Sequence, residues 1–85
     1  MEQFTYTITD PMGLHARPAG LLAKTAKGLD SAVTVRRGER AVSAVRLLEL
    51  MTMGVKQGDT VTVTITGGDE RASRAAIERF FQENL

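Results

Sequence analysis

Apolar and polar residues alternate in several segments of the chain, and a period of two is typical of strands that bury one face. The alternation is clearest over residues 60–66, where valine and isoleucine are separated by threonine, and it is also present over residues 4–8. A shorter segment, 33–35, leads through an Arg-Gly-Glu turn into residues 40–44, whose pattern is weaker. The sequence therefore predicts four strands, with apolar side chains facing a core and threonine and arginine facing water.

Three other segments place apolar residues at the three- and four-residue spacing of a helix face. The first covers residues 19–26 and ends near Gly28, the second is a short stretch over residues 47–51, and the third covers residues 72–81 after a suitable N-cap, Asp69. The residues of the third helix at four-residue spacing are Ala72, Ala76 and Phe80. The pattern predicts a two-layer α+β sandwich in the order strand, helix, strand, strand, helix, strand, helix.

Composition narrows the classes of function. The 85 residues carry 11 basic and 10 acidic side chains, a balance that gives no electrostatic case for nucleic-acid binding. The chain has no cysteine and one histidine, so we expect no disulfide, no metal and no cofactor. It shows no signal-peptide pattern and no apolar run near the ~20 residues that span a bilayer. We expect one cytoplasmic domain over residues 1–85, without membrane insertion.

The single histidine lies in the run Gly-Leu-His-Ala-Arg-Pro, residues 13–18, where the first helix begins. The first N–H groups of a helix lack partners, and the helix dipole adds positive charge there. A phosphoryl group on His15 would meet the N–H groups of Ala16 and Arg17 and the Arg17 guanidinium. Pro18 is tolerated in a first turn. The alternative is that His15 is a surface residue that caps a helix, with Arg17 solvated.

Two motifs resemble the HPr family, the histidine-containing phosphocarriers of the bacterial sugar phosphotransferase system. They are Gly-Leu-His-Ala-Arg-Pro-Ala at residues 13–19 and Leu-Met-Thr-Met-Gly-Val-Lys-Gln-Gly at residues 50–58, and the resemblance covers essentially the whole chain. It implies an open-faced sandwich with a four-stranded antiparallel sheet, two long helices and one short helix. It also implies that His15 carries phosphate on Nδ1.

The resemblance further implies the partners and the role of the chain. Phosphorylated enzyme I, charged from phosphoenolpyruvate, would be the donor, and enzyme IIA proteins of sugar uptake would be the acceptors. The chain would be a monomeric carrier rather than an enzyme, covalently phosphorylated as an intermediate in a transferase relay. A specialised HPr homologue in a nitrogen-related or dihydroxyacetone branch is an alternative. A small RNA-binding α+β module is another, although it would need strand aromatics or a basic stripe.

A docking surface is implied by the same resemblance, formed by Gly20, Lys24, Leu47, Leu48 and Met51. The short second helix cannot bury every face, so we expect Leu50 to point inward and its apolar neighbours to remain exposed. The alternative is that these neighbours are ordinary core residues. We interpret Met51 and Met53 as packing residues rather than ligands. The arginines at positions 36, 37 and 40 are interpreted as a solvated hairpin end.

Position 46 departs from many members of the HPr family, which carry a kinase-phosphorylated serine at the start of the second helix. This chain has Arg46 there, and the nearby Ser43 falls in the preceding strand or turn. We therefore predict no regulatory serine at this place. A permanent positive charge at Arg46 would favour acidic partner surfaces, mainly through the association rate.

Overall fold

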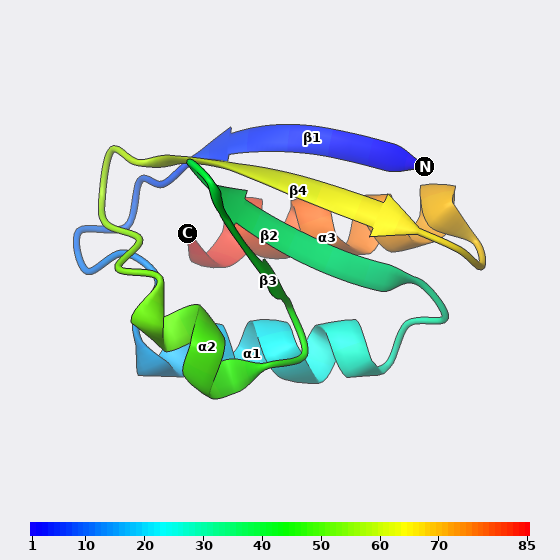
Figure 1. Ribbon diagram of the computed structural model, residues 1–85, viewed down its shortest axis with the longest axis horizontal. Helices are drawn as coiled ribbons and strands as arrows, with labels where there is room; N and C mark the ends of the chain where they lie inside the picture. The colour runs from blue at the N-terminus through cyan, green and yellow to red at the C-terminus, as the bar shows by residue number, and fades with distance from the viewer.

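A computed structural model describes residues 1–85 as a four-stranded sheet with three helices on one of its faces (Figure 1). The elements in chain order are β1 (Glu2–Thr7), α1 (Ala16–Lys27), β2 (Ala32–Arg37), β3 (Arg40–Ser43), α2 (Leu47–Thr52), β4 (Thr60–Thr66) and α3 (Glu70–Asn84). The strand order is β1-β4-β2-β3, and every neighbouring pair is antiparallel. The open-faced α+β sandwich and its predicted element order are confirmed.

The alternating sequence pattern becomes rows of side chains across the sheet. On the inner face, Phe4 pairs with Val63, Val63 with Val35, and Val35 with Val42, and all four are buried. The next row, on the outer face, contains threonine and arginine side chains that are exposed or half-buried. The register of each strand pair places apolar residues opposite apolar residues. The apolar residues of four separate segments therefore form one inner surface.

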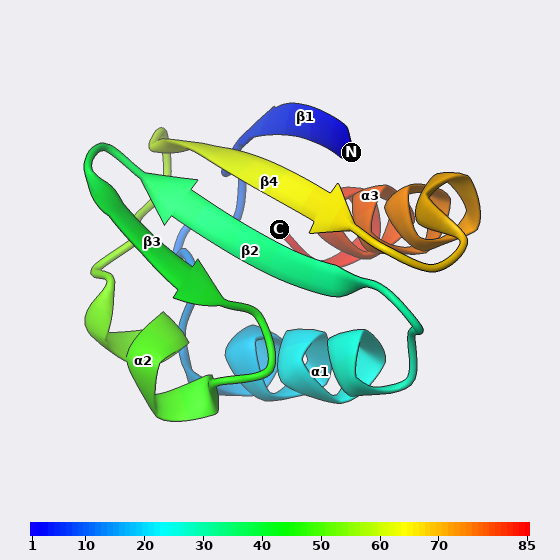
Figure 2. The ribbon, with the colours of Figure 1, turned by 45° about the vertical axis from the view of Figure 1, so that its right-hand side comes forward.

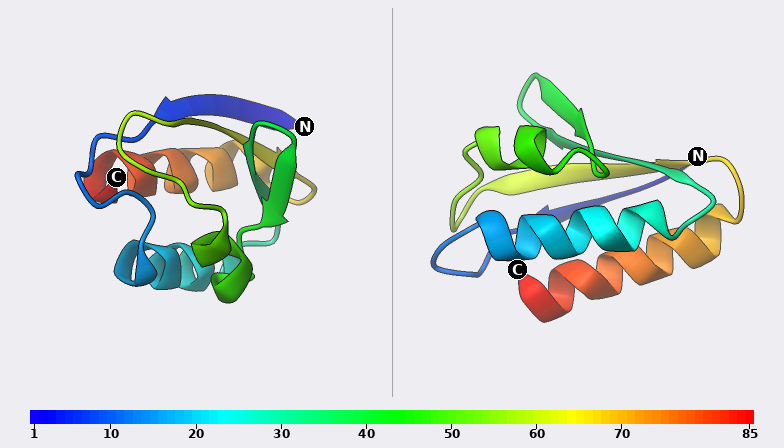
Figure 3. Two further views of the ribbon diagram at one scale, coloured as in Figure 1. Left: turned by 60° about the vertical axis from the view of Figure 1, so that its left-hand side comes forward. Right: turned by 90° about the horizontal axis from the view of Figure 1, so that it is seen from below.

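Helices α1 and α3 lie side by side against this inner surface (Figure 3). The predicted face of α1 is buried, and that helix ends at Lys27, just before Gly28. The predicted face of α3 needs one correction, because Ala72 is exposed and Ser73 is buried in its place. The Ser73 hydroxyl is hydrogen-bonded to the Ser31 hydroxyl at 2.7 Å, which satisfies a polar group inside the core. None of the helices is both long and apolar enough to span a membrane.

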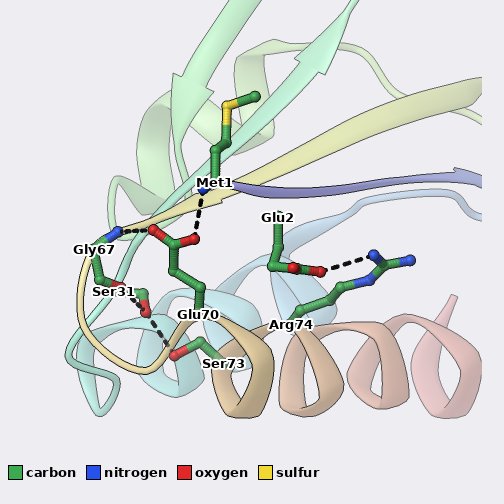
Figure 4. Close-up of polar contacts among 7 residues, drawn as sticks. All are labelled: Met1, Glu2, Ser31, Gly67, Glu70, Ser73 and Arg74. Carbon is green, nitrogen blue, oxygen red and sulfur yellow. Dashed lines mark hydrogen bonds and ion pairs between the residues drawn. The ribbon is translucent and has the colours of Figure 1, made fainter.

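The beginnings of β1 and α3 are held together by polar contacts (Figure 4). The Met1 ammonium lies 2.6 Å from Glu70 Oε1, and Glu70 Oε2 accepts a hydrogen bond from the Gly67 N–H at 2.6 Å. The ammonium lowers the pKa of Glu70, and the Glu70 carboxylate raises the pKa of the ammonium. Arg74 donates to Glu2 at 3.0 Å. These contacts lie at the side of the molecule where α1 ends, whereas His15 lies where α1 begins (Figure 1).

Candidate functional site

His15 lies at the N-cap position of α1, with extended backbone angles of φ −93° and ψ −173°. Its carbonyl oxygen accepts the Ala19 N–H at 3.0 Å, but its half-buried imidazole makes no capping hydrogen bond. The N–H groups of Ala16 and Arg17 have no partner within the helix, and Pro18 has no N–H to satisfy. The end of α1 therefore presents two free donors next to an unengaged imidazole.

His15 and Arg17 line one groove of about 230 Å³, whose other lining residues are Asp10, Pro18, Leu21, Glu83 and Asn84. No ion pair in the structure involves Arg17, so its exposed guanidinium is available to an anion. The two carboxylates of the groove are engaged elsewhere. Asp10 accepts from the Met12 N–H at 2.8 Å, and Glu83 accepts from Arg79 Nε at 3.2 Å. A small anion at His15 would thus meet the free N–H groups of the α1 N-terminus and the Arg17 guanidinium, in a groove that Asp10 and Glu83 also line.

The groove includes residues that the sequence did not indicate. Glu83 and Asn84 belong to the last turn of α3, and Leu21 lies one turn into α1. The end of α3 reaches the site only because α1 and α3 pack side by side. No local pattern marks Glu83 or Asn84, which lie almost seventy residues from His15 in the chain.

The two sequence motifs meet beside His15. We call residues 53–59, which connect α2 to β4, the support loop. The Leu14 N–H donates to the Val55 carbonyl oxygen of this loop at 3.1 Å. Gly13 has a φ of +66°, and a Cβ on it would collide with the same carbonyl oxygen. Only glycine readily adopts this positive φ and also lacks the Cβ that would collide. Close contact with the second motif therefore requires glycine at position 13.

The outward face of α2 is apolar. Leu48 is 75% exposed and Leu47 and Met51 are partly exposed, whereas Leu50 is 1% exposed and anchors the helix to the core. The inward and outward faces of this short helix agree with the prediction, and the docking role of the outward face stays a prediction. Met53 packs in the core, but the packing interpretation of Met51 is wrong because that side chain lies on the outward face.

Residues of α1 and the start of α2 border this apolar face. Lys24 is exposed and Gly20 is half-buried on α1. Arg46 holds the N-cap position of α2 without a capping hydrogen bond, and its Nε lies 3.6 Å from Glu49 Oε2. Ser43 is the last residue of β3, as the sequence predicted. A second groove, of about 380 Å³, is lined by Lys27, Val45, Arg46, Leu47, Leu48 and Glu49.

All three hairpin arginines are exposed, as the sequence interpretation expected, but two of them also make hydrogen bonds that it did not foresee. Arg37 Nη1 donates to the carbonyl oxygens of Met53 at 2.7 Å and Gly54 at 3.1 Å. Arg40 donates to the Thr52 carbonyl oxygen at 3.0 Å and to its hydroxyl at 2.6 Å. The β2–β3 hairpin and α2 lie together at one edge of the fold (Figure 2). The last carbonyls of a helix lack partners and carry negative charge, so they attract these cations.

The remaining predictions concern metals and nucleic acid. The structure contains no group of three or more histidine, cysteine, aspartate or glutamate side chains that could hold a metal ion. The aromatic residues of β1, Phe4 and Tyr6, make edge contacts with the Phe81 ring at centroid distances of 5.9 and 5.4 Å. They are therefore used in packing against α3, and the outer face of the sheet offers no aromatic ring for base stacking.

Comparison with known proteins gives a consistent result. The family model described as the PTS HPr component phosphorylation site matches residues 2–83. The multiphosphoryl transfer protein of Xanthomonas campestris pv. campestris is 44% identical over 71 residues, which cover 84% of this chain and 8% of that protein. The phosphocarrier protein HPr of Mycoplasma capricolum subsp. capricolum is 35% identical over 79 residues, covering 93% of this chain and 89% of that one.

The fold comparison agrees. A solved histidine-containing phosphocarrier protein of Mycoplasma matches with a TM-score of 0.92 and 33% identity, covering 96% of this chain and 93% of the other. HPr-C-His of Thermoanaerobacter tengcongensis matches with a TM-score of 0.91 and 32% identity, covering 98% and 93%. The chain belongs to the HPr family. It is a phosphocarrier of the phosphotransferase system rather than a catalytic enzyme, and its partners are proteins of that system.

Proposed function

We propose that His15 is the phosphoryl acceptor and that Nδ1 forms the bond to phosphorus. The observation that carries this proposal is the unengaged imidazole at the open N-terminus of α1, beside the free Arg17 guanidinium. As the N–P bond forms, the bond from phosphorus to the donor protein breaks. The reverse exchange passes the phosphoryl group to the next protein. His15 is thus a nucleophile in the first step and a leaving group in the second.

Transfer at such a site depends on alignment and on charge stabilisation, since the transferring group is already reactive. The N–H groups of Ala16 and Arg17 and the Arg17 guanidinium would hold the phosphoryl oxygens. We propose phosphorylated enzyme I as the donor and enzyme IIA proteins as acceptors. In this role the chain is a cytoplasmic, monomeric, covalently phosphorylated intermediate that acts as one domain over residues 1–85.

The experiment is incubation with enzyme I and phosphoenolpyruvate, followed by intact mass measurement. The wild-type chain should gain one phosphoryl group in an acid-labile, alkali-stable linkage. The variant His15→Ala should gain none while its melting temperature stays close to that of the wild type. Stoichiometric labelling of His15→Ala, or an acid-stable phosphate on the wild type, would overturn the assignment of His15.

We further propose that partners dock on the apolar face of α2 and the adjoining part of α1, through Gly20, Lys24, Leu47, Leu48 and Met51. Exposed apolar groups beside a reactive side chain are suited to partner binding. Leu47→Asp should raise the KM for the chain in phosphorylation by enzyme I, because the contact would bury an unpaired carboxylate. Its melting temperature should change little. A large fall in melting temperature would show instead that Leu47 belongs to the core.

Arg46 at the edge of this surface would favour acidic partners through the association rate. We propose that the chain works without phosphorylation at position 46. Incubation with HPr kinase and ATP should leave the wild-type chain unmodified, and Arg46→Ser is the variant that would restore a hydroxyl at this place. Stoichiometric labelling of the wild type at Ser43 or Thr52 would show that regulation uses another hydroxyl.

A second candidate is service in a specialised phosphotransfer branch. The observation that favours it is the 44% identity with a region of a multiphosphoryl transfer protein, above the 35% identity with HPr of M. capricolum. The two candidates share the histidine chemistry and differ in the acceptor. Transfer from the phosphorylated chain to a panel of enzyme IIA proteins, sugar-specific and specialised, separates them by relative rate.

A further inference from the structure

The chain segment that leads to His15, residues 8–14, is joined to the support loop at both of its ends. The bonds between the two segments are Leu14 N–H to Val55 O at 3.1 Å, Gly58 N–H to Ile8 O at 2.9 Å, Ile8 N–H to Asp59 O at 2.9 Å and Gln57 Nε2 to Thr9 O at 3.1 Å. Gly13 adds a close contact with Val55. The position of His15 therefore depends on the position of the support loop.

The support loop is held from its other side by one side chain. Arg37, at the end of β2, donates Nη1 to the carbonyl oxygens of Met53 and Gly54, and its Nε lies 3.3 Å from Asp59 Oδ2. The same Asp59 oxygen accepts the Lys56 N–H at 2.8 Å. Arg37 thus contacts the first two residues and the last residue of the loop. Its guanidinium geometry permits this, since one planar group can donate in several directions at once.

We propose that Arg37 is a positioning residue for phosphoryl transfer, acting through the support loop on Leu14 and His15. This inference rests on the proposed role of His15. Arg37 lines neither the groove of His15 nor the groove beside Leu47 and Leu48. It contacts α2 only at the Met53 carbonyl oxygen, and Arg40 separately holds Thr52, the last residue of that helix. Loss of Arg37 should therefore loosen the loop without displacing the docking surface.

The physical reason is that transfer requires phosphorus, Nδ1 and the leaving atom to be aligned. Without Arg37, the Met53 and Gly54 carbonyls would be left to water and Asp59 would keep only the Lys56 N–H. The Val55 carbonyl would then sample a wider range of positions, and so would the Leu14 N–H that it accepts. A reactive group whose support is loosened spends less time in the productive geometry.

The test compares Arg37→Gln with Arg36→Gln in the full chain. Arg36 is the matched control, because it is the neighbouring residue on β2, carries the same charge and is exposed without a polar partner. In phosphorylation by enzyme I, Arg37→Gln should lower kcat about tenfold and change KM less than about twofold. Hydrogen exchange of the Leu14 amide should be about tenfold faster. Arg36→Gln should match the wild type in all three quantities, and Arg37→Lys should restore part of kcat.

The outcomes are distinct. Unchanged kcat with faster Leu14 exchange would overturn the inference, because the loop would be held without effect on the reaction. A raised KM with unchanged kcat would overturn it in favour of a docking role. If Arg37→Gln does not fold, Asp59→Asn tests the same contact more gently and should give a smaller fall in kcat. Failure of the wild type to accept phosphate would overturn the proposed function itself. Hydrogen exchange of the Leu14 amide needs no phosphate, so it would still show whether Arg37 acts on Leu14 through the support loop.

Discussion

The N-terminus of α3 is capped by a side chain of the chain itself, whereas the N-terminus of α1 has no capping side chain. Asp69 caps α3 by accepting the Ala72 N–H at 3.2 Å, and Glu70 adds a carboxylate to the first turn. At α1, the cap position holds His15 without a capping bond, and the first turn has no acidic residue. A carboxylate at a helix start stabilises the helix, while an open start keeps its donors for an external anion.

The comparison extends to the second residue of each helix, which is arginine in both. Arg71 in α3 is exposed and takes part in no ion pair, and Arg17 in α1 is likewise exposed and unpaired. The difference is that Arg17 lines a groove with a histidine. The same residue type at the same helical position therefore has different surroundings in the two helices. If the start of α1 binds phosphate as proposed, the surroundings that the fold assembles are what distinguish it from the start of α3.

The largest effect is expected from His15→Asp, which would give α1 the type of cap that α3 has. Phosphorylation by enzyme I should be abolished, because the imidazole is gone. The free energy of unfolding should rise by about 1 kcal/mol, since the extended backbone at position 15 suits a capping carboxylate. Intact mass and denaturant unfolding measure the two effects. His15→Ala is the control and should lose phosphorylation without the gain; a less stable aspartate variant would contradict the comparison.

The next effect tests the two arginines against each other. Arg17→Gln should lower the rate of phosphorylation about a hundredfold, because a charged donor to the transferring group is lost. Arg71→Gln should leave that rate within about twofold of the wild type, since this arginine lies at the other helix start. Single-turnover kinetics with phosphorylated enzyme I measures both. Equal effects of the two substitutions would mean that net charge, rather than the groove, governs the rate.

A smaller effect is expected from removing the cap of α3. Asp69→Ala should lower the free energy of unfolding by about 1 kcal/mol, because the Ala72 N–H loses its partner. The rate of phosphorylation should not change, which would separate the stabilising helix start from the reactive one. Denaturant unfolding and the enzyme I assay on the same sample measure the pair. A fall in rate with this variant would show that the two helix ends are coupled.

The smallest effect concerns pH and the contact between Met1 and Glu70. The pKa of Glu70 is lowered, so its contribution to stability is lost as the pH falls through that lowered value. The pKa of the Met1 ammonium is raised, so its contribution is lost as the pH rises through that raised value. The contact should therefore be fully effective between the ordinary pKa values of 4.5 and 8.0. Comparing the melting temperatures of wild type and Glu70→Gln across pH should show the difference largest in that window.

Local patterns were sufficient for much of the fold. The alternation over residues 60–66 predicted β4, and the spacing over residues 19–26 predicted the inner face of α1. The inner face of α3 could not be read as well, because Ser73 is buried against a partner hydroxyl forty-two residues away. A serine looks like a surface residue until the group that satisfies it is known.

The residues of the candidate site also fall into those that the sequence indicated and those that it did not. His15 and Arg17 could be singled out from one short motif, since both belong to the start of one helix. Glu83 and Arg37 could not, because each reaches the region of the site through packing of an element distant in sequence. An arginine in a hairpin is normally solvated. Arg37 also donates to the Met53 and Gly54 carbonyl oxygens, because the fold places the end of α2 beside the hairpin.

The groove around His15 also has a consequence for the order in which the molecule is made. It is lined by residues near position 10, residues of α1 and residues 83 and 84. Strand β4 pairs with β1 across almost sixty residues of chain, so the sheet cannot form until β4 has left the ribosome. The histidine is synthesised early, but its complete surroundings are formed only after α3 has packed. A nascent chain therefore carries His15 before the groove around it exists.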